Sequence, residues 1–336
     1  MKIADMHCDT ISEIWESAKT GSPQQLSRNK LHVDIQKMKQ AGYLLQNFAM
    51  YVDLKKGIDP FAYVLELIDV FNTEMEKNKN DICVIKTYDE IRRNEKEGKI
   101  SALMTIEEGG CCKGEPEHLE TLYHLGARMM TLTWNYPNEL AFPNLISEEA
   151  PESLDAGGGV QRGFPVFDNT NGLTKKGFLF VERMEELGMI VDVSHLSDKG
   201  FWDIVKNTRK PFVASHSNAR SLCGHARNLT DDMIRAVADR GGVIGLNYYG
   251  CFLNERNDSH STVSRMAAHA RHIINVGGQE CLGLGSDFDG IGGELEIQDC
   301  SQMHKLVAEF ERQHFTAGEI ENILHRNVLR VYRELL

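Results

Sequence analysis

The first ten residues end in side chains that could hold a metal ion. His7 and Asp9 follow a short apolar segment, residues 3–6, which we expect to be a strand. Because side chains alternate between the two faces of a strand, His7 and Asp9 share one face while Cys8 points away. An imidazole and a carboxylate that converge in this way suit a divalent metal such as zinc. The alternative is a polar strand end without a ligand, since a His-x-Asp pair also arises by chance.

Side chains of the same types follow apolar segments further along the chain: Glu107, His195, His216 and Asp287. Taken singly, Glu107 fits an acidic turn, and each histidine fits a buried imidazole with hydrogen-bond partners. Gly109 and Gly110, after the second acid Glu108, indicate a site that some group approaches closely. Together these side chains favour a shared site, because two histidines, a His-Asp pair and a bridging carboxylate can hold two divalent metals.

Eight apolar segments alternate with helical patterns over the whole chain. We expect strands at residues 3–6, 43–51, 101–106, 128–133, 189–193, 211–214, 242–246 and 281–285. Parallel strands need helical crossovers, and these look buried on both faces, so the pattern predicts an α/β fold of the (β/α)8 TIM-barrel type. A doubly wound open sheet is the alternative. It gives no reason for ligand-type residues at the ends of five strands, whereas barrels carry their sites there.

Helices are expected between and after these strands, at residues 31–41, around 64–71, and at 119–125, 173–187, 198–206, 231–240, 261–276, 302–313 and 317–335. No break in composition divides the chain, so residues 1–336 are expected to form one barrel domain. Residues 138–171 carry no regular pattern and are rich in Pro, Gly, Asn and acidic residues. A connection that long predicts an active-site lid, with an ordinary surface loop as the alternative.

Composition excludes several classes of function. The formal charge of -12 over 336 residues disfavours nucleic acid as a partner, because polyphosphate binding needs a concentrated basic surface. The eight cysteines include no Cys-x-x-Cys pair, which favours free thiols over a disulfide framework. Met1 and Lys2 lead straight into the first expected strand, which leaves no room for a signal segment. We therefore expect a cytoplasmic protein without a membrane partner, and a homodimer is left open.

Several blocks extend the pattern along the chain: His7-Cys8-Asp9, Ile106-Glu107 ahead of Gly109-Gly110, residues 122–126 (LYHLG), residues 172–174 (GLT), residues 187–195 (LGMIVDVSH), Ser215-His216-Ser217, Arg227-Asn228 and residues 285–290 (GSDFDG). On these blocks, which span nearly the whole chain in order, the sequence resembles the membrane dipeptidase (renal dipeptidase) family of the amidohydrolase superfamily. The resemblance implies a zinc-dependent dipeptidase that hydrolyses the peptide bond of free dipeptides.

The resemblance also implies the composition of the site. Carried over by position, His7 and Asp9 would hold one of two zinc ions, and His195 and His216 would hold the other. Glu107 would bridge them. It is preferred to Glu108 because its separation in sequence from the block at 122–126 matches the family without a gap. Other divalent metals could replace zinc. The attacking group would be a hydroxide held between the metals, whose pKa falls towards ~7 in such sites.

Three further residues are assigned by the same resemblance. Asp287, rather than Asp289, corresponds to the acid/base group that would move the proton. Arg227 corresponds to the arginine that meets the substrate carboxylate, a role suited to its planar charged fork, against the alternative of a surface cation beside a helix start. Trp134 departs from the family, because the better-known members have a substrate-contacting histidine there. An indole donates one hydrogen bond and cannot accept one, so substrate preference is expected to differ.

Two alternatives to a dipeptidase follow from the same residues. The first is another binuclear amidohydrolase, acting on an N-acyl amino acid, a lactam or a phosphoester. The second is a barrel that binds a metal or another ligand without catalysis. The presence of all six expected metal and acid positions argues against the second alternative.

Overall fold

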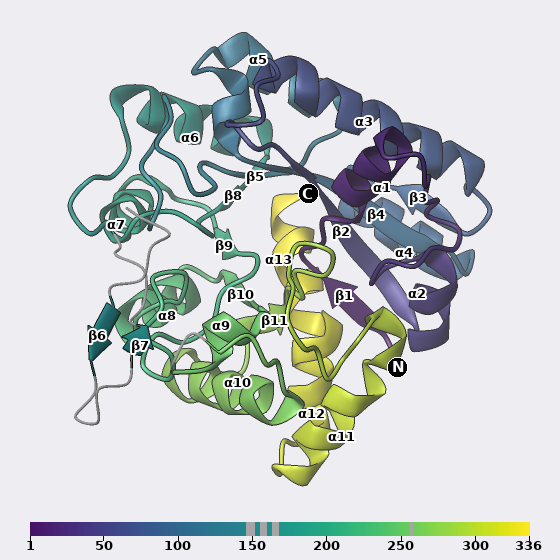
Figure 1. The fold of residues 1–336 in the computed structure, drawn as a ribbon, viewed down its shortest axis with the longest axis vertical. Coiled ribbons are helices and arrows are strands. Elements are labelled where there is room, and N and C mark those ends of the chain that lie inside the picture. Colours follow the sequence, from purple (N-terminus) through teal and green to yellow (C-terminus); the bar gives the residue numbers. More distant parts are fainter. Residues whose placement is uncertain (146–151, 155–159, 163–167, 256–257) are drawn as a thin grey trace.

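A computed structural model describes residues 1–145, 152–154, 160–162, 168–255 and 258–336 (Figure 1). At its centre, eight parallel strands form a closed ring: β1 (Ile3–Asp5), β2 (Tyr43–Tyr51), β4 (Ile100–Glu107), β5 (Met129–Thr131), β8 (Ile190–Asp192), β9 (Val213–Ala214), β10 (Val243–Leu246) and β11 (Leu282–Leu284). Pairing of Asp5 with Leu284 joins the first strand to the last and closes the ring. The predicted (β/α)8 barrel is therefore confirmed.

Helices surround the ring of strands and connect its members (Figure 1). They are α1 (Thr10–Lys19), α2 (Ile35–Ala41), α3 (Pro60–Lys77), α4 (Tyr88–Lys96), α5 (Pro116–Leu125), α6 (Lys175–Leu187), α7 (Asp198–Asn207), α8 (Asp231–Asp239), α9 (Gly250–Leu253), α10 (Val263–Gly277), α11 (His304–Arg312), α12 (Ala317–Glu321) and α13 (Asn327–Leu335). Short turns of tighter or wider helix are η1 (Gly109–Cys112), η2 (Cys300–Gln302) and η3 (Asn322–Arg326).

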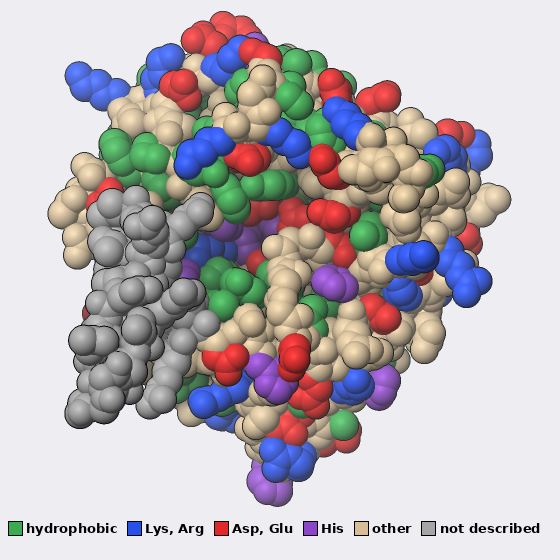
Figure 2. Space-filling view, viewed as in Figure 1, with side chains coloured by type: hydrophobic (Ala, Val, Ile, Leu, Met, Phe, Trp, Pro, Cys, Tyr) green, Lys and Arg blue, Asp and Glu red, His purple; other side chains and the backbone are tan. Residues whose placement is uncertain are grey.

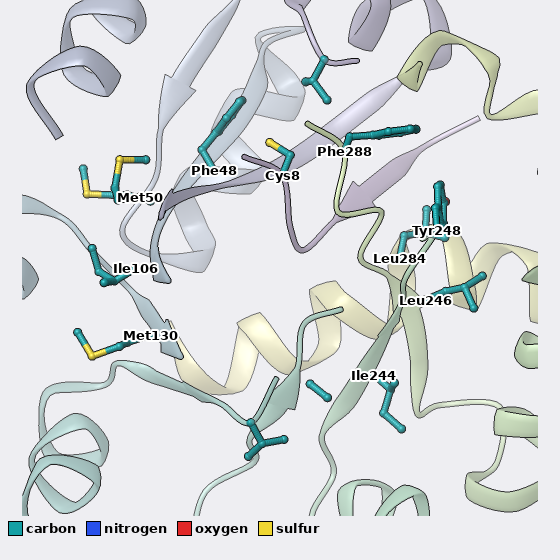
Figure 3. Close-up of a cluster of buried hydrophobic side chains, with 14 of the residues drawn as sticks. Cys8, Phe48, Met50, Ile106, Met130, Ile244, Leu246, Tyr248, Leu284 and Phe288 are labelled. Atoms are coloured by element: carbon teal, nitrogen blue, oxygen red, sulfur yellow. The ribbon is translucent and has the colours of Figure 1, made fainter. Parts of the chain in front are cut away.

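Two layers of buried apolar side chains hold the barrel together. The outer layer lies between the strands and the helices, and Figure 3 shows side chains such as Phe48, Ile106 and Leu246 pointing away from the centre of the ring. The inner layer comes from the first residues of the strands, including Met129 and Val243, and it packs against α13. Since α13 lies at the centre of the ring in Figure 1, it closes the amino end of the barrel and leaves the carboxyl end for the site.

Some elements differ from the sequence-based expectations. The helix expected at 31–41 begins only at Ile35, because Asp34 has extended backbone angles and its side chain accepts a hydrogen bond from the Lys37 amide. The single helix expected at 317–335 is divided by the wider turn η3. The sequence analysis missed α1, α4 and β3 (Ile82–Val84), a short strand that pairs with the start of β4.

The expected lid at residues 138–171 falls partly outside the described residues, which omit 146–151, 155–159 and 163–167. Its described parts include a short antiparallel pair, β6 (Glu152–Leu154) and β7 (Val160–Arg162), although no regular element was expected there. As for membranes, each helix in the described ranges is too short or too polar to cross a bilayer.

Candidate active site

The candidate ligands meet at the carboxyl end of the barrel. They come from the ends of β1, β4, β8, β9 and β11, and all are buried: His7, Asp9, Glu107, His195, His216 and Asp287. Donor atoms of two overlapping groups lie within 4.8 Å of one another. The groups are His7 with Glu107 and His216, and His7 with Asp9 and Asp287. The structure therefore brings together every metal and acid position expected from the sequence.

Glu107 lies between two sets of side chains. Its Oε2 lies 3.3 Å from His7 Nε2, which is also 3.3 Å from Asp9 Oδ2. Its Oε1 lies 3.1 Å from His195 Nε2 and 3.6 Å from His216 Nε2. The two oxygens of one carboxylate thus face different imidazoles, which is the arrangement that a bridging ligand requires.

Hydrogen bonds set the tautomer of His216. The Ser215 hydroxyl donates to Asp192 Oδ2. Its oxygen lies 2.7 Å from His216 Nδ1, so with its own proton committed it must accept from that nitrogen. His216 Nε2 then carries a lone pair that points into the site, as a metal-binding imidazole needs.

His195 is oriented in the same way by an amide. Its Nδ1 lies 3.0 Å from Asn135 Oδ1, an acceptor, so Nδ1 donates and Nε2 carries the lone pair. The Nε2 atoms of His195 and His216 are 3.0 Å apart. Two lone pairs that face each other at this distance repel unless a cation lies between them.

Glycines allow these strand ends to approach closely. A Cβ on Gly245 would lie 1.8 Å from the Ser215 carbonyl oxygen, and one on Gly285 would lie 1.7 Å from it. In return, the Ser217 amide donates to the Gly245 carbonyl over 2.8 Å. The segment that carries His216 can therefore sit against β10 and β11 only because neither position has a side chain.

Asp287 follows β11 and faces the site with one oxygen. Asn247 Nδ2 donates to its Oδ2 over 2.8 Å, while Oδ1 lies 3.8 Å from His7 Nε2. Its φ of 63° is a left-handed value that few non-glycine residues adopt. Burial raises the pKa of the carboxyl above its ordinary value, against the opposing effect of His7.

Arg227 is a buried cation at the wall of the site. Its Nη2 donates to the His216 carbonyl over 3.1 Å and its Nη1 to Ser217 Oγ over 3.4 Å. Its Nε has no hydrogen-bond partner, and no carboxylate of the described residues forms an ion pair with the guanidinium. Burial lowers its pKa to about 10, so it remains charged at neutral pH. A buried guanidinium of this kind suits an anionic ligand.

A cavity of about 500 Å³ opens above these residues. In Figure 2 the hollow at the centre of the face shows acidic, histidine and basic side chains at its base. Its lining combines the site with aromatic and acidic groups, among them Tyr51, Trp134, Tyr249, Phe252, Glu13 and Asp289. Its volume is in the range of small-molecule sites.

The charged groups disturb each other's ionisation strongly. Burial alone would lower the pKa of His7, but the carboxylates of Glu107 and Asp9 raise it well above its ordinary value. Burial raises the pKa of Asp9, and the charge of Glu107 adds to that effect. Burial, together with the charge of Arg227, lowers the pKa of His195 to about 3. Buried groups whose pKa values are shifted in this way are typical of functional sites.

These side chains fit a divalent metal pair. Ligands about 2.0–2.2 Å from a tetrahedral zinc lie roughly 3.3–3.6 Å from one another. The donor separations of 3.3 Å around His7 and of 3.0, 3.1 and 3.6 Å around His195 are close to these values. Moreover, His7 Nε2 and Asp9 Oδ1 are buried without a hydrogen-bond partner. A cation held by His7 and Asp9 would satisfy these atoms.

The sequence analysis missed the residues that support the ligands. Asn135 and Asn247 each form a hydrogen bond with one of the predicted side chains, and Asp192 acts on His216 through the Ser215 hydroxyl. Each lies at or just after the end of a barrel strand, so the rule that found the ligands could have found them. Their partners, however, become visible only when the strands are placed side by side.

Comparisons with known proteins identify the family of this chain. A family model described as membrane dipeptidase, peptidase family M19, matches residues 1–335. A relative named as an uncharacterized dipeptidase of Schizosaccharomyces pombe is 32% identical over 316 residues, covering 90% of this chain and 72% of the relative. A Klebsiella pneumoniae protein, described as uncharacterized and in the pqqA 5′ region, is 34% identical over 244 residues, covering 71% of this chain and 84% of the relative.

Solved structures share the fold. A metallo peptidase from Rhodobacter sphaeroides, liganded with a phosphinate mimic of the dipeptide L-Ala-D-Ala, superposes with a TM-score of 0.86 at 22% identity, covering 100% of this chain and 99% of that one. A structure described as dipeptidase AC has a TM-score of 0.85 at 24% identity, covering 100% and 98%. Because the family model spans nearly the whole sequence, the chain belongs to the membrane dipeptidase family, peptidase family M19, and is a metal-dependent dipeptidase.

Proposed function

We propose that this dipeptidase uses two zinc ions, held by His7 and Asp9 on one side and by His195 and His216 on the other, with Glu107 between them. The observation that carries the proposal is the division of the two Glu107 oxygens between separate sets of imidazoles, 3.3 Å away on one side and 3.1 Å on the other. When bound, the metals would supply Lewis-acid polarisation of the scissile carbonyl and a water of lowered pKa.

We assign the proton transfer to Asp287. Its Oδ2 is held by the Asn247 amide, so Oδ1 is the oxygen that is turned to the reacting centre. A carboxyl whose pKa is raised by burial can take a proton from the attacking water and release it to the leaving amine. Asn247 fixes the direction in which that oxygen points.

We assign the substrate carboxylate to Arg227. The guanidinium lines the cavity, is 2% exposed and forms no ion pair with a described carboxylate. A dipeptide lying with its free carboxylate on Arg227 would place its peptide bond over Glu107. The Rhodobacter sphaeroides structure with its dipeptide mimic supports a dipeptide as the substrate class.

Metal analysis combined with a substrate comparison tests the proposal. We expect two zinc ions per chain, hydrolysis of free dipeptides, and loss of activity on chelation with recovery on adding zinc. N-acetylated dipeptides should be poor substrates. An active metal-free protein would disprove the metal assignment, and preference for the N-acetylated compounds would favour the other amidohydrolase activities considered above.

Two further predictions concern the cellular location and the oligomeric state. All eight cysteines are free thiols, which supports a cytoplasmic location because disulfides are rare there. Cell fractionation would test it. The open question of a homodimer can be answered by measuring the mass in solution, for example by light scattering on the purified protein.

A further inference from the structure

The residue after the proposed bridging carboxylate is itself a buried acid. Glu108 is 0% exposed, and its backbone has a φ of 92°, a left-handed value unfavourable for a residue with a side chain. This conformation turns its carboxylate away from Glu107 and into the loop after β5. A buried carboxylate in a strained backbone needs specific partners.

Glu108 has three such partners. Its Oε2 accepts a hydrogen bond from the Trp134 amide over 2.8 Å, and its Oε1 accepts one from the Gly110 amide over 2.7 Å. Oε1 also accepts from the Asn138 side-chain amide. The carboxylate thus forms hydrogen bonds with both the first and the last residue of the segment from Trp134 to Asn138.

The glycines that follow belong to this arrangement. A Cβ on Gly110 would lie 2.6 Å from Glu108 Oε1, and one on Gly109 would lie 3.1 Å from the Thr131 carbonyl oxygen. The sequence indicated that some group approaches these glycines closely. That group is the carboxylate of Glu108 itself, together with the loop after β5.

The segment held by Glu108 forms one wall of the cavity. The Trp134 ring packs edge-on against Tyr51 at 5.0 Å and against Tyr136 at 5.4 Å between centroids, and it lies 6.2 Å from the His195 ring. Tyr51 and Trp134 both line the cavity. We call Tyr51 and Trp134, with Tyr136 behind them, the aromatic wall.

The aromatic wall begins two places round the barrel from Arg227 and extends to the opposite side. Arg227 follows β9, whereas Trp134 follows β5, two places away in the ring, and Tyr51 ends β2, four places away. A dipeptide whose carboxylate meets Arg227 therefore extends its first residue, the one before the scissile bond, towards the aromatic wall. Tyr51 and Trp134 line the cavity, and aromatic rings favour contact with apolar and aromatic side chains.

We propose that Glu108 is a positioning residue: it fixes Trp134, and the aromatic wall then selects dipeptides with a large apolar side chain on the first residue. The proposal rests on the proposed function for the direction in which the substrate lies. It assigns to the second acid of the pair a role separate from that of Glu107.

Kinetics with two substrates that differ only in the first residue test this assignment. For Glu108→Gln we expect KM for Phe-Ala to rise about tenfold while kcat changes little, and both constants for Gly-Ala to stay within about twofold. Zinc content should equal that of the parent. The matched control is Glu117→Gln, an exposed acid at the start of α5, which should change neither substrate.

A double-mutant cycle separates positioning from general damage. Trp134→Ala should show the same selective loss for Phe-Ala, and Glu108→Gln in the Trp134→Ala background should add almost nothing. Equal losses for both substrates, or fully additive losses, would contradict the proposal. If Glu108→Gln does not fold, Asn138→Ala removes one of the three contacts and should give a smaller effect in the same direction.

Fluorescence gives a readout without catalysis. In a Trp15→Phe, Trp202→Phe background only Trp134 emits, and we expect acrylamide to quench it more strongly in Glu108→Gln than in Glu117→Gln. Unchanged quenching would overturn the positioning role. Because this measurement needs no substrate, it distinguishes failure of the inference from failure of the proposed function, which would appear as parent protein inactive on Gly-Ala.

Discussion

The two ends of the barrel are built from opposite kinds of residue. The carboxyl end gathers buried charged groups and imidazoles, and some of their atoms, including ones in His7, Asp9 and Arg227, have no hydrogen-bond partner. The amino end is closed by α13, where Val328 and Val331 pack against the first residues of the strands. Burial of apolar surface at the amino end stabilises the fold, whereas burial of charge at the carboxyl end costs stability. The residues that stabilise the fold thus lie at the amino end of the barrel, and the residues suited to chemistry lie at the carboxyl end.

Backbone strain follows the same division. Within the described ranges, six non-glycine residues have a positive φ, and four of them lie around the site: Glu108, His195, Asp287 and Asp289. Each such conformation costs about 1–3 kcal/mol and persists only where the surroundings enforce it. No residue of the inner apolar layer is among the six. Variants at the two ends should therefore separate activity from stability.

The largest effect is expected at the carboxyl end. Asp287→Asn removes the group assigned to proton transfer and keeps its shape, so kcat should fall about 10²–10⁴-fold. The thermal midpoint should not fall, because one buried carboxylate near Asp9 and Glu107 is lost. Steady-state kinetics, zinc analysis and thermal unfolding measure the three quantities.

Asp232→Asn is the matched control for this variant, since Asp232 has a largely exposed side chain on α8. It should leave all three quantities unchanged. Parental turnover by Asp287→Asn would remove Asp287 from the mechanism. A large loss of stability instead would mean that the charged end also supports the fold, which would break the comparison.

The converse is expected at the amino end. Leu103 is fully buried in the inner layer, and Leu103→Ala should lower the free energy of unfolding by about 2–5 kcal/mol. Activity per folded molecule should stay at the parental value, since the site is at the other end of the strand. Denaturant titration with kinetics on the same samples tests both. Leu179→Ala, at a position that is 62% exposed, is the control and should change little.

A smaller effect on metal binding is expected at Ser215, which holds the proposed metal ligand His216 in place. Ser215→Ala removes the oxygen that accepts from His216 Nδ1 and leaves Asp192 short of one donor. Losing such a support typically costs about 10–100-fold in metal affinity or activity. Titration with buffered zinc measures the metal affinity. Ser221→Ala, an exposed serine whose hydroxyl meets His272, should bind zinc as the parent does.

Much of the barrel could be predicted because its signals are local. Each strand of the ring is a short apolar run, and its last residue or the next few carry the polar side chain of the site. The sequence also marks the start of a helix where a residue can act as a cap, as Thr230 does before α8 by accepting from the Met233 amide. Such signals need no knowledge of neighbouring segments.

What could not be predicted depends on contacts between distant segments. The three apolar residues of the short strand β3 resemble those of the ring strands, and only their pairing with the start of β4 shows that they form an additional strand at its edge. In α6, helical spacing from Val181 and Met184 predicts that Phe178 faces the core, but Phe178 is 36% exposed and Phe180 is buried instead. The contact of Glu108 with Trp134 likewise spans 26 residues and requires the loop to be folded.

The smallest effect is expected at a polar contact between α13 and β2. Asn47 Nδ2 donates to the Tyr332 hydroxyl over 2.6 Å, and both residues are fully buried. Tyr332→Phe leaves that amide without its acceptor, so the free energy of unfolding should fall by about 1 kcal/mol. Tyr88→Phe, whose hydroxyl has no hydrogen bond to any described residue, is the control. Asn47 lies on β2, nearer the amino end of the barrel than Tyr51. A change in kcat or KM for Tyr332→Phe would therefore show that α13 helps to position the aromatic wall. A loss confined to stability against denaturant would mean that the two ends act independently.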